Sequence, residues 1–503
     1  MPGAPSAPGG GRRGPSGLAW TVVAALAAIA LIIGGGVWYA NWSQSGGISG
    51  GGPSVGPSQP PDAKNTSGAT DSTAEQAPAD PAARTLLRVS APKVTGRGAT
   101  DSVAGSWLTD SVYAKAGLYR IVGYDADSGA VKWTLPLPGQ TCAGSPETTS
   151  KGIAVVVTEA ARRANSRSYH PCTEVTAFEM ATGRKLWTSS IQLGGAKLEF
   201  KEVTISGTTV AVGGGNDGGA AFAAATGEVL WQPKNDVCED VGYAGGDALV
   251  AVRRCGLGVQ ARYQVQLLEP KSGAAQWTYK LPTGVADSPK LISTDPVVFG
   301  VDRGTTTASG ATEVYSMDDD GDLQARIALT DGTYAHSCEP GLVDDCHGIV
   351  VGNEKLYVPT MRHKVSNGSG SADSTDSTAL TNEIVAFSLA SGKLTDDRVA
   401  AGAGRTVFPV RMDGGNLLVY RDGTAARSAA QVLSVDGTSL RQTTLLETPA
   451  TAVSHTLIAA LAPETAELHY SGGRLFLARK LVSATARGAA ARPYAAVGFA
   501  LRG

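Results

Sequence analysis

The sequence is poor in charge. Charged residues make up 17% of the 503 positions, and the formal net charge is −2. Proteins that bind nucleic acid concentrate basic side chains on one face, so this balance gives no reason to expect nucleic acid as a partner. Hydrophobic residues reach 42%, and glycines number 64. The chain can therefore build a substantial core, and its many glycines fit a protein of short strands and tight turns.

Recognisable catalytic and metal-binding motifs are also missing. The six histidines are scattered along the chain, and no Ser, His and acid form a nucleophile motif, although such triads converge in space rather than in sequence. Asp318–Asp322 resembles a calcium loop but lacks the bidentate Glu of the twelfth position, so we interpret it as a solvated hairpin turn. Gly256 and Gly258 lie between two predicted strands, which excludes the strand–turn–helix context of a dinucleotide-binding site.

A long apolar run lies near the N-terminus. Residues 18–40, LAWTVVAALAAIALIIGGGVWYA, are uncharged over 23 positions, enough to cross a hydrocarbon core of about 30 Å as a helix. Both ends carry aromatic residues of the kind found at membrane interfaces: Trp20, Trp38, Tyr39 and Trp42. Arg12 and Arg13 precede the run, and no Lys or Arg follows it before position 64. The positive-inside bias therefore predicts a cytoplasmic tail at 1–17, a transmembrane helix at 18–40 and export of the rest.

A cleaved signal peptide is the alternative. Such a peptide has an apolar region of about 7–15 residues followed by small residues at the cut, whereas this run is longer and ends in aromatics. A twin-arginine export signal fits less well, because no apolar residues closely follow the arginine pair. Residues 41–83 are mostly Gly, Ser, Pro, Thr, Ala and Asp, a composition that cannot bury enough apolar surface to fold. They are predicted to form a flexible linker.

One pattern recurs from Arg84 onward. A short apolar strand is followed by Ser, Thr or Asp, then by Gly, and four residues after that Gly by Trp. The complete copies contain Gly129 and Trp133, Gly183 and Trp187, Gly227 and Trp231, and Gly273 and Trp277. Three later copies keep the polar–glycine turn without the Trp, at Gly321, Gly392 and Gly437. Glycine supplies the positive φ of a tight hairpin, and the Trp can pack as an apolar wedge between neighbouring units.

The spacing of these turns predicts a β-propeller. Successive glycines lie 54, 44, 46, 48, 71 and 45 residues apart, and a period in the forties with several short strands per unit is typical of propeller blades. The long interval contains VSNGSGSADSTDSTALTN, which we interpret as an exposed disordered loop. Three apolar stretches follow Gly437, and TLLRVSA from Thr85 can supply a fourth strand. We expect eight four-stranded antiparallel blades closed between the two ends of residues 84–503, with seven blades as the alternative.

These segments resemble the quinoprotein, or pyrroloquinoline-quinone (PQQ), repeat, whose consensus is roughly Ala-x-Asp-x-x-Thr-Gly-x-x-x-Trp. The closest copies run from Phe178 to Trp187 and from Phe222 to Trp231, and the resemblance covers most of residues 84–503. It implies an all-β propeller but fixes no function, because this fold hosts enzymes, assembly factors and sensors. The excess of Arg over Lys, with abundant Ala and Gly, indicates a high-GC bacterial member of actinobacterial type.

Quinone-dependent oxidation is the activity that the resemblance raises first. Dehydrogenases of this family typically hold the quinone over a calcium ion, and many carry a disulfide between adjacent cysteines beside it. No adjacent cysteine pair occurs here, and no Glu, Asn and Asp calcium set matches a motif position. We therefore expect a protein without a cofactor that is not an enzyme, and no catalytic residue is assigned.

The region after residue 84 contains six cysteines, and an even number in an exported protein suggests disulfides. Each consecutive pair falls between two repeat turns, and so within one blade. This predicts Cys142 bonded to Cys172, Cys238 to Cys255, and Cys338 to Cys346. The alternative at the last pair is zinc bound by His336, Cys338, Cys346 and His347, but the spacing H-x-C-x7-C-H matches no standard structural site.

We expect a non-catalytic binding or scaffold module on the outer side of the cell membrane. Its partners would be other envelope proteins, cell-wall polymers or extracellular ligands, because function concentrates on the loops around a propeller's funnel. Assembly propellers with similar repeats act by protein contact. The alternatives are a PQQ-dependent dehydrogenase, a ligand sensor, and a glycan-processing enzyme with paired carboxylates in the funnel. The sequence singles out no functional funnel residue.

Overall fold

The computed structural model describes residues 74–94, 99–165, 168–232, 237–256, 260–303, 310–330, 332–364, 380–423, 428–484 and 494–502. The transmembrane helix predicted at 18–40, the tail predicted at 1–17 and the linker before residue 74 lie outside these ranges. No helix within them is long and apolar enough to cross a membrane.

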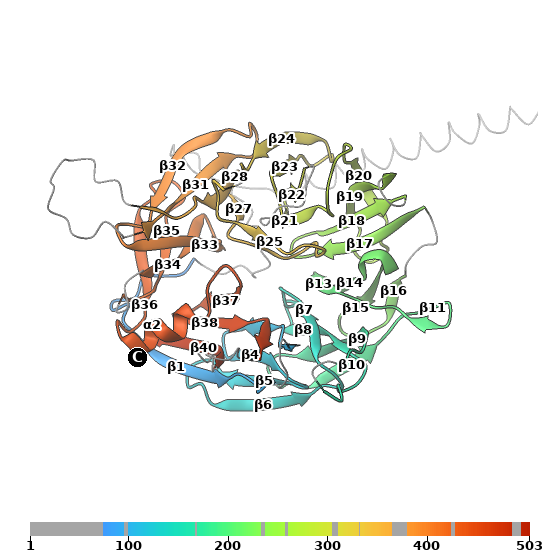
Figure 1. Ribbon diagram of the computed structural model, residues 1–503, viewed down its shortest axis with the longest axis horizontal. Helices are drawn as coiled ribbons and strands as arrows, with labels where there is room; N and C mark the ends of the chain where they lie inside the picture. Colours follow the sequence, from blue (N-terminus) through green and yellow to red (C-terminus); the bar gives the residue numbers. More distant parts are fainter. Residues whose placement is uncertain are drawn as a thin grey trace, which may run out of the picture. The chain divides into compact units, whose positions relative to one another are not determined.

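In the described ranges, eight four-stranded antiparallel sheets surround one central axis as blades (Figure 1). The predicted eight-bladed propeller is confirmed, and the seven-bladed alternative is wrong. With the innermost strand first, blades 1 to 4 consist of β3 (Ser106–Leu108), β4 (Val112–Gly117), β5 (Arg120–Asp125) and β6 (Val131–Pro136); β7 (Thr141–Gly144), β8 (Ile153–Glu159), β9 (Cys172–Glu179) and β10 (Lys185–Ser189); β13 (Glu202–Ser206), β14 (Thr209–Gly213), β15 (Gly219–Ala223) and β16 (Val229–Trp231); and β17 (Cys238–Ala244), β18 (Leu249–Cys255), β19 (Arg262–Leu268) and β20 (Ala275–Lys280).

The remaining blades follow the same plan. Blades 5 to 8 consist of β21 (Lys290–Thr294), β22 (Val297–Val301), β23 (Glu313–Met317) and β24 (Leu323–Ala328); β27 (Val350–Gly352), β28 (Lys355–Pro359), β31 (Glu383–Ser388) and β32 (Leu394–Ala400); β33 (Arg405–Asp413), β34 (Asn416–Gly423), β35 (Gln431–Val435) and β36 (Gln442–Glu447); and β37 (Ala466–Ser471), β38 (Arg474–Arg479), β40 (Tyr494–Leu501) and β1 (Ala83–Ser90). The second strands β8, β14 and β22 are buried at every position, because both faces of each blade pack against neighbouring sheets.

The ring closes between strands from the two ends of the folded region. β1 is the outer strand of blade 8 and pairs antiparallel with β40, with Leu87 opposite Gly498. Leu87 is buried in one apolar cluster with Phe476 and Ala496. The prediction that the segment from Thr85 supplies the missing outer strand is therefore confirmed. Opening the ring would break this pairing and expose sheet edges.

The repeat glycines stand at the turns between the third and fourth strands. Gly129, Gly183 and Gly227 have φ of 72°, 69° and 73°, values that disfavour residues with a Cβ. Gly437 was predicted to be the corresponding turn residue of blade 7, and this is wrong. Leu440 occupies the position instead, with a φ of 57°, and its N–H donates to the Asp436 carbonyl as Gly129 does to Asp125. The polar–glycine pair at 436–437 lies three residues before the equivalent turn position.

The tryptophans of the repeat join each blade to the next. The Trp133 indole lies over Gly183, where an added Cβ would come within 2.4 Å of the ring, and its Nε1 donates to the Met180 carbonyl at 3.0 Å. Trp187 makes the equivalent hydrogen bond to Ala224, at 2.8 Å, and covers Gly227. The turn glycine therefore serves two needs, a positive φ and room for the neighbouring indole.

Short ribbons and helices extend this plan. They are β2 (Thr100–Ser102) with β39 (Leu481–Ser483), β11 (Gln192–Leu193) with β12 (Ala196–Lys197), β25 (Ser337–Cys338) with β26 (Cys346–His347), β29 (His363–Lys364) with β30 (Leu380–Thr381), the 3-10 helix η1 (Gly215–Asp217) and α2 (Ala452–Ala459). The long interval between Gly321 and Gly392 thus contains the β25–β26 ribbon, which the repeat pattern did not predict. Most of the low-complexity stretch in that interval, residues 365–379, lies outside the described ranges.

Candidate functional site

A cavity of about 900 Å³ opens at the centre of one face of the propeller. It lies at the start of β37 and the end of β38, so its walls come from the connections between blades and not from the hairpin turns that carry the repeat glycines. Residues from widely separated stretches of the chain line it, among them Ser106, Ser145, Glu202, His347, Glu464 and Lys480. We call this the central cavity.

The β25–β26 ribbon forms one wall of the central cavity. Its two strands are joined by the disulfide between Cys338 and Cys346, and the loop between them reaches blade 5. There the Leu342 carbonyl accepts a hydrogen bond from Lys290 Nζ at 2.8 Å, and the Val343 carbonyl accepts one from the Leu291 N–H at 2.8 Å. The ribbon is therefore fastened inside the channel by backbone groups.

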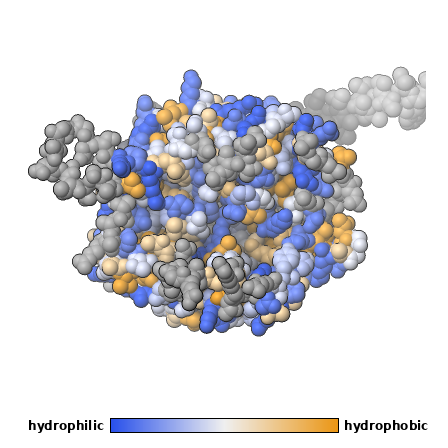
Figure 2. Space-filling view, in the orientation of Figure 1, coloured by the Kyte–Doolittle hydropathy of each residue, from blue (hydrophilic) through white to orange (hydrophobic). Residues whose placement is uncertain are grey.

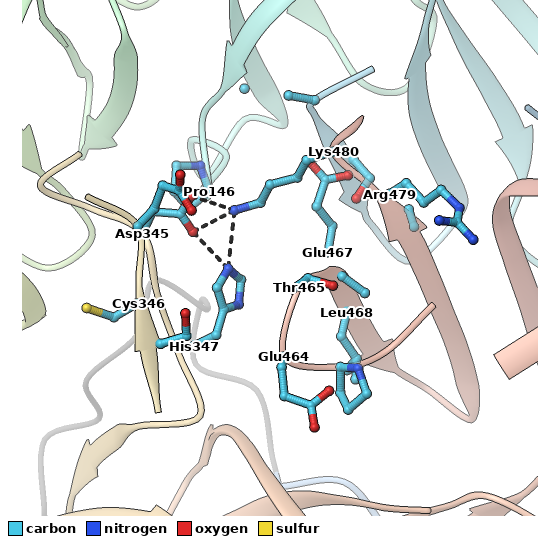
Figure 3. A pocket seen from close by; sticks show the side chains of 18 of the residues that line it. Pro146, Asp345, Cys346, His347, Glu464, Thr465, Glu467, Leu468, Arg479 and Lys480 are labelled. Atoms are coloured by element: carbon cyan, nitrogen blue, oxygen red, sulfur yellow. Dashed lines mark hydrogen bonds and ion pairs between the residues drawn. The ribbon is translucent and has the colours of Figure 1, made fainter. Parts of the chain in front are cut away.

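A charged network joins the ribbon to blade 8 (Figure 3). Lys480 Nζ lies 2.5 and 2.7 Å from the two carboxylate oxygens of Asp345 and 3.2 Å from His347 Nε2. His347 Nε2 is also 2.8 Å from Asp345 Oδ1. Burial by itself raises the pKa of Asp345, but the hydrogen bond with His347 and the charge of Lys480 outweigh it and bring that pKa to about 2. Asp345 is therefore a stable anion that holds Lys480 and contacts His347.

A second ion pair lies deeper in blades 1 and 8. Lys115 Nζ contacts Glu467 Oε2 at 2.8 Å, and the Gly105 N–H donates to Glu467 Oε1 at 2.6 Å. Burial lowers the pKa of Lys115, and Glu467 partly restores it. Ser106 Oγ lies 2.9 Å from His469 Nε2, and burial lowers the pKa of that histidine. These charges compensate one another within the wall of the cavity.

Three carboxyl groups converge beside the ribbon. Thr204 Oγ1 on β13 lies 3.1 Å from Glu147 Oε2 and 3.1 Å from Asp344 Oδ2. Glu202 Oε2 accepts a hydrogen bond from the Val343 N–H at 2.8 Å. Glu202 Oε1 is enclosed by glycine backbone, because a Cβ on Gly242 would come within 1.4 Å of it. We call Glu147, Glu202 and Asp344 the acid cluster.

The three carboxyl groups of the acid cluster hold their protons at higher pH than exposed carboxyl groups do. Burial raises the pKa of Glu147 to about 6 and that of Glu202 to about 7. Burial, with the charges of Glu147 and Glu202, raises the pKa of Asp344 well above its usual range. Within the described ranges, no group of three His, Cys, Asp or Glu side chains has a geometry that could hold a metal ion. The raised pKa values therefore favour protonated carboxyl groups in this cluster.

The residues considered as zinc ligands do not form a metal site. Cys338 and Cys346 are bonded to each other, which removes both thiolates. His336 is buried, with Nε2 at 2.9 Å from the Ala311 carbonyl oxygen, whereas His347 faces Asp345 and Lys480. The aspartates at 318–322 form an exposed turn between β23 and β24, where Asp318 Oδ1 accepts from the Asp322 N–H at 2.8 Å.

The structure also places the other cysteines. Cys142 on β7 is bonded to Cys172 on β9, and Cys238 on β17 is bonded to Cys255 on β18, so both disulfides lie within a blade. The pair Cys338 and Cys346 lies in the ribbon between blades 5 and 6. The expectation that every pair falls within one blade is thus wrong for the third pair, because the ribbon is an insertion between two blades.

The side chains of the central cavity do not fit the quinone cofactor that the repeat resemblance raises. A quinone bound over a calcium ion needs several oxygen ligands turned toward one cation. Here the candidate carboxyl groups are occupied by Thr204, by the Val343 N–H and by the ammonium groups of Lys115 and Lys480. We derive no reaction step through that cofactor.

Sequence reasoning missed the residues of this site. They belong to segments far apart in the chain, as the separations of 352 residues between Lys115 and Glu467 and 140 residues between Thr204 and Asp344 show. A local signal exists for some of them. Lys115, Glu202 and Glu467 interrupt apolar innermost or second strands, where a charge must find a buried partner.

Comparison with known proteins finds one matching family model and several solved structures of similar fold. Residues 172–366 match the family described as outer membrane protein assembly factor BamB. Among solved structures, BamB from Moraxella catarrhalis is 12% identical, with 82% of this chain and 99% of that chain covered and a TM-score of 0.41. A quinohemoprotein alcohol dehydrogenase from Pseudomonas putida HK5 is 11% identical, with 83% and 76% covered and a TM-score of 0.46. No curated protein matches the sequence.

The family assignment rests on the repeats and on the blades that they build. The matched residues contain three of the four complete copies of the glycine–tryptophan pattern, and each copy forms the outer hairpin of a four-stranded blade. The chain is therefore a β-propeller in which residues 172–366 match a family model of this repeat type.

Proposed function

We propose that this protein is a membrane-tethered, extracytoplasmic propeller that binds envelope proteins or cell-wall and extracellular ligands, without catalysing a reaction on them. The observation that carries the proposal is the central cavity, in whose wall Asp345 is paired with Lys480 and Glu467 with Lys115. A cavity of about 900 Å³ is large enough to receive a loop or a chain end of a partner. The description of the matched family, an outer membrane protein assembly factor, supports a role in contact with other envelope proteins.

The pairing of charges supports binding over catalysis. Asp345 is neutralised by Lys480, Glu467 by Lys115, and Glu464 by Arg362, whose Nη2 lies 2.7 Å away. A catalytic acid or base needs an open position toward its substrate. Around these pairs the wall offers hydroxyl groups and small apolar residues, including Ser337, Thr465 and Ala462. Such a surface suits recognition by shape and hydrogen bonds.

The proposed tether would attach on the opposite face. The Glu75 N–H donates to Asp413 Oδ2 at 2.7 Å, and Glu75 Oε1 accepts from the Gly472 N–H at 2.9 Å. Asp413 and Gly472 stand at the turns that end β33 and β37, whereas the central cavity lies at the start of β37. Ala74, the first described residue, lies beside Gly414 and thus on the face opposite the central cavity.

Site-specific photo-crosslinking in cells tests this proposal. A photoreactive residue replaces Ala462 or Thr465, which are exposed at the cavity, and Lys271 serves as the control. Lys271 is exposed on the β19–β20 turn, at the strand ends remote from the cavity. We expect the two cavity positions to crosslink to the same exported protein or cell-wall fragment, and Lys271 not to do so. Equal labelling from all three positions would contradict a binding role for the cavity.

Calorimetric titration with pyrroloquinoline quinone and calcium tests the absence of catalysis. We expect no saturable heat of binding, because the carboxyl groups of the cavity are occupied by protein partners. One-site saturable binding, followed by oxidation of an alcohol or sugar, would overturn the non-catalytic assignment in favour of a dehydrogenase. This outcome is distinguishable from failure of the crosslinking experiment, which concerns the partner and not the cofactor.

A further inference from the structure

We propose that Glu147, Thr204 and Asp344 form a proton-binding latch that holds the β25–β26 ribbon in the channel, and that loss of the proton releases the ribbon from blade 3. Here the ribbon means residues 337–347. The proposal concerns access to the depth of the central cavity and does not depend on the identity of the partner.

The first observation is that the Thr204 hydroxyl has one hydrogen but two carboxyl neighbours. Its Oγ1 lies 3.1 Å from a carboxyl oxygen of Glu147 and 3.1 Å from one of Asp344, but a hydroxyl carries one hydrogen. Glu147 Oε2 also accepts from the Ile205 N–H, at 3.4 Å, but two ionised carboxylates would still compete for the single Thr204 hydrogen. The arrangement is satisfied when one carboxyl is protonated and donates to Thr204 Oγ1 while Thr204 donates to the other. The geometry thus stores one proton between blade 2 and the ribbon.

Among the described residues, the lysines that face the latch are already bonded to other groups. Lys290 faces the acid cluster but is bonded to Asp287 Oδ2 at 2.9 Å and to the Leu342 carbonyl. On the other side, Lys480 is held by Asp345 and His347. The remaining titratable groups that face the cluster are Glu202, Asp247 and Tyr243, none of them cationic. Loss of the proton would therefore leave adjacent carboxylates without a counter-charge.

The carboxyl groups of the acid cluster titrate within a pH range that experiments can reach. Burial raises the pKa of Glu147 to about 6 and that of Glu202 to about 7, and it also raises the pKa of Asp344. A carboxyl whose pKa is raised in the folded state stabilises that state below its unfolded pKa, and this contribution is lost as the pH rises through the folded pKa. The latch is thus closed near pH 5 and weakens between about pH 6 and 8.

The ribbon's contacts with blade 3 are separate from the bonds of Leu342 and Val343 that fasten it to blade 5. The disulfide between Cys338 and Cys346 closes it into a short hairpin, and its contact with blade 3 consists of the Asp344–Thr204 and Val343–Glu202 interactions. The Asp345–Lys480 ion pair on the other side keeps its charge in the same pH range, because the pKa of Asp345 is about 2. Release from blade 3 alone would widen the channel beside the acid cluster.

Amide hydrogen exchange of the full chain, in a mild detergent, tests the latch. Exchange in residues 338–347 is compared at pH 5.5 and pH 8.0 and corrected for the intrinsic base-catalysed rate, with β14 (Thr209–Gly213) as the internal reference. We expect protection of the ribbon, measured relative to that of β14, to fall about tenfold or more at the higher pH, since a pKa near 6 lies about two units below it. Equal protection of the ribbon at both pH values would overturn the proposal.

Variants of the latch residues test whether the pH dependence of ribbon protection comes from the latch. Glu147→Gln with Asp344→Asn keeps hydrogen-bonding groups that cannot ionise, so ribbon protection should vary less than about twofold between the two pH values. Glu339→Gln is the matched control, because Glu339 is an exposed acid of the same ribbon loop and should keep the wild-type pH dependence. The single variant Asp344→Asn serves if the double variant does not fold. A wild-type fall in protection that persists in the latch variant would overturn the assignment.

Discussion

At the scale of single residues, the contact between an indole and the turn glycine of the next blade stabilises neighbouring blades. Trp133, Trp187, Trp231 and Trp277 all lie over such a glycine. The first three also donate an indole hydrogen bond to a carbonyl three residues before that glycine. Trp277 Nε1 has no hydrogen-bond partner among the described residues. The repeat therefore combines apolar packing with a directional bond that fixes the position of each blade.

Gly183→Ala should destabilise the protein more than Gly207→Ala. Both glycines have positive φ, 69° and 56°, which costs about 1 kcal/mol for a residue with a Cβ. At Gly183 the new Cβ also meets the Trp133 ring, whereas nothing lies within 4 Å at Gly207. We expect an additional loss of about 1–3 kcal/mol for Gly183→Ala from overpacking. Denaturant unfolding of both variants measures the difference, and equal losses would show that the indole yields without cost.

Trp187→Phe should destabilise the protein more than Trp277→Phe. Both changes shorten an aromatic wedge, buried at Trp187 and half-buried at Trp277, but only the first removes an indole hydrogen bond to the Ala224 carbonyl. The net value of such a bond is about 1 kcal/mol. Thermal melting under matched conditions gives the comparison. If Trp277→Phe cost as much, the hydrogen bond would add nothing to the packing.

At the scale of elements, the β25–β26 ribbon differs from the blades that surround it. It is an insertion between β24 and β27, it carries its own disulfide, and it supplies Asp344, Asp345 and His347 to the central cavity. Each blade strand is paired within a four-stranded sheet, whereas this two-stranded ribbon is held by a few side-chain and backbone contacts to blades 3, 5 and 8. Its stability is therefore local and separable from that of the propeller.

Cys338→Ser with Cys346→Ser should loosen the ribbon without unfolding the propeller. The disulfide closes a loop of 8 residues in sequence separation, a constraint that contributes about 2–3 kcal/mol in the chain-entropy model. Hydrogen exchange should rise in residues 338–347, while the melting temperature changes little. The control, Cys238→Ser with Cys255→Ser, removes a bond inside blade 4 and should lower the melting temperature. A comparable drop in melting temperature for both pairs would show that the ribbon is part of the cooperative core.

At the scale of the whole molecule, pairing of β1 with β40 closes the ring, and the central cavity collects side chains from blades that are distant in sequence. Closure places the innermost strands around one axis. Charged residues on those strands and on the blade connections then meet in a confined, half-buried space, where ion pairs and raised pKa values arise together. The eightfold arrangement is what makes the acid cluster possible.

Stability should fall as the pH rises from about 5 to 8. The raised pKa values of Glu147, Glu202 and Asp344 stabilise the folded state below about pH 4.5, and this contribution is lost as each group ionises in the fold. The lowered pKa of His469 acts in the opposite direction near pH 6.5. Because three carboxyl groups lose their stabilising effect over this range and only one histidine gains one, we expect the free energy of unfolding to fall by a few kcal/mol, at about 1.4 kcal/mol per pKa unit. Denaturant midpoints at pH 5 and pH 8 measure it, and a higher midpoint at pH 8 would contradict the assignment.

The local part of the fold could be predicted from the sequence. A glycine with positive φ and a tryptophan four residues later are adjacent along the chain, so the hairpin at Gly183 and Trp187 is visible without any knowledge of distant contacts. The period of these hairpins also gave the blades and the closing strand. The local pattern failed at Gly437, because the turn of blade 7 places Leu440 at the positive-φ position and a polar–glycine pair alone does not define the register.

The sequence by itself determined the repeat, the number of blades that it implies and the pairing of cysteines that lie close along the chain. Only the tertiary structure decided the site. Glu147, Thr204 and Asp344 come from the β7–β8 turn of blade 2, an inner strand of blade 3 and an inserted ribbon, and no short-range pattern links them. Hairpin geometry follows from neighbouring residues, whereas a buried carboxyl cluster depends on which charges ring closure brings together and on how much water it removes from them.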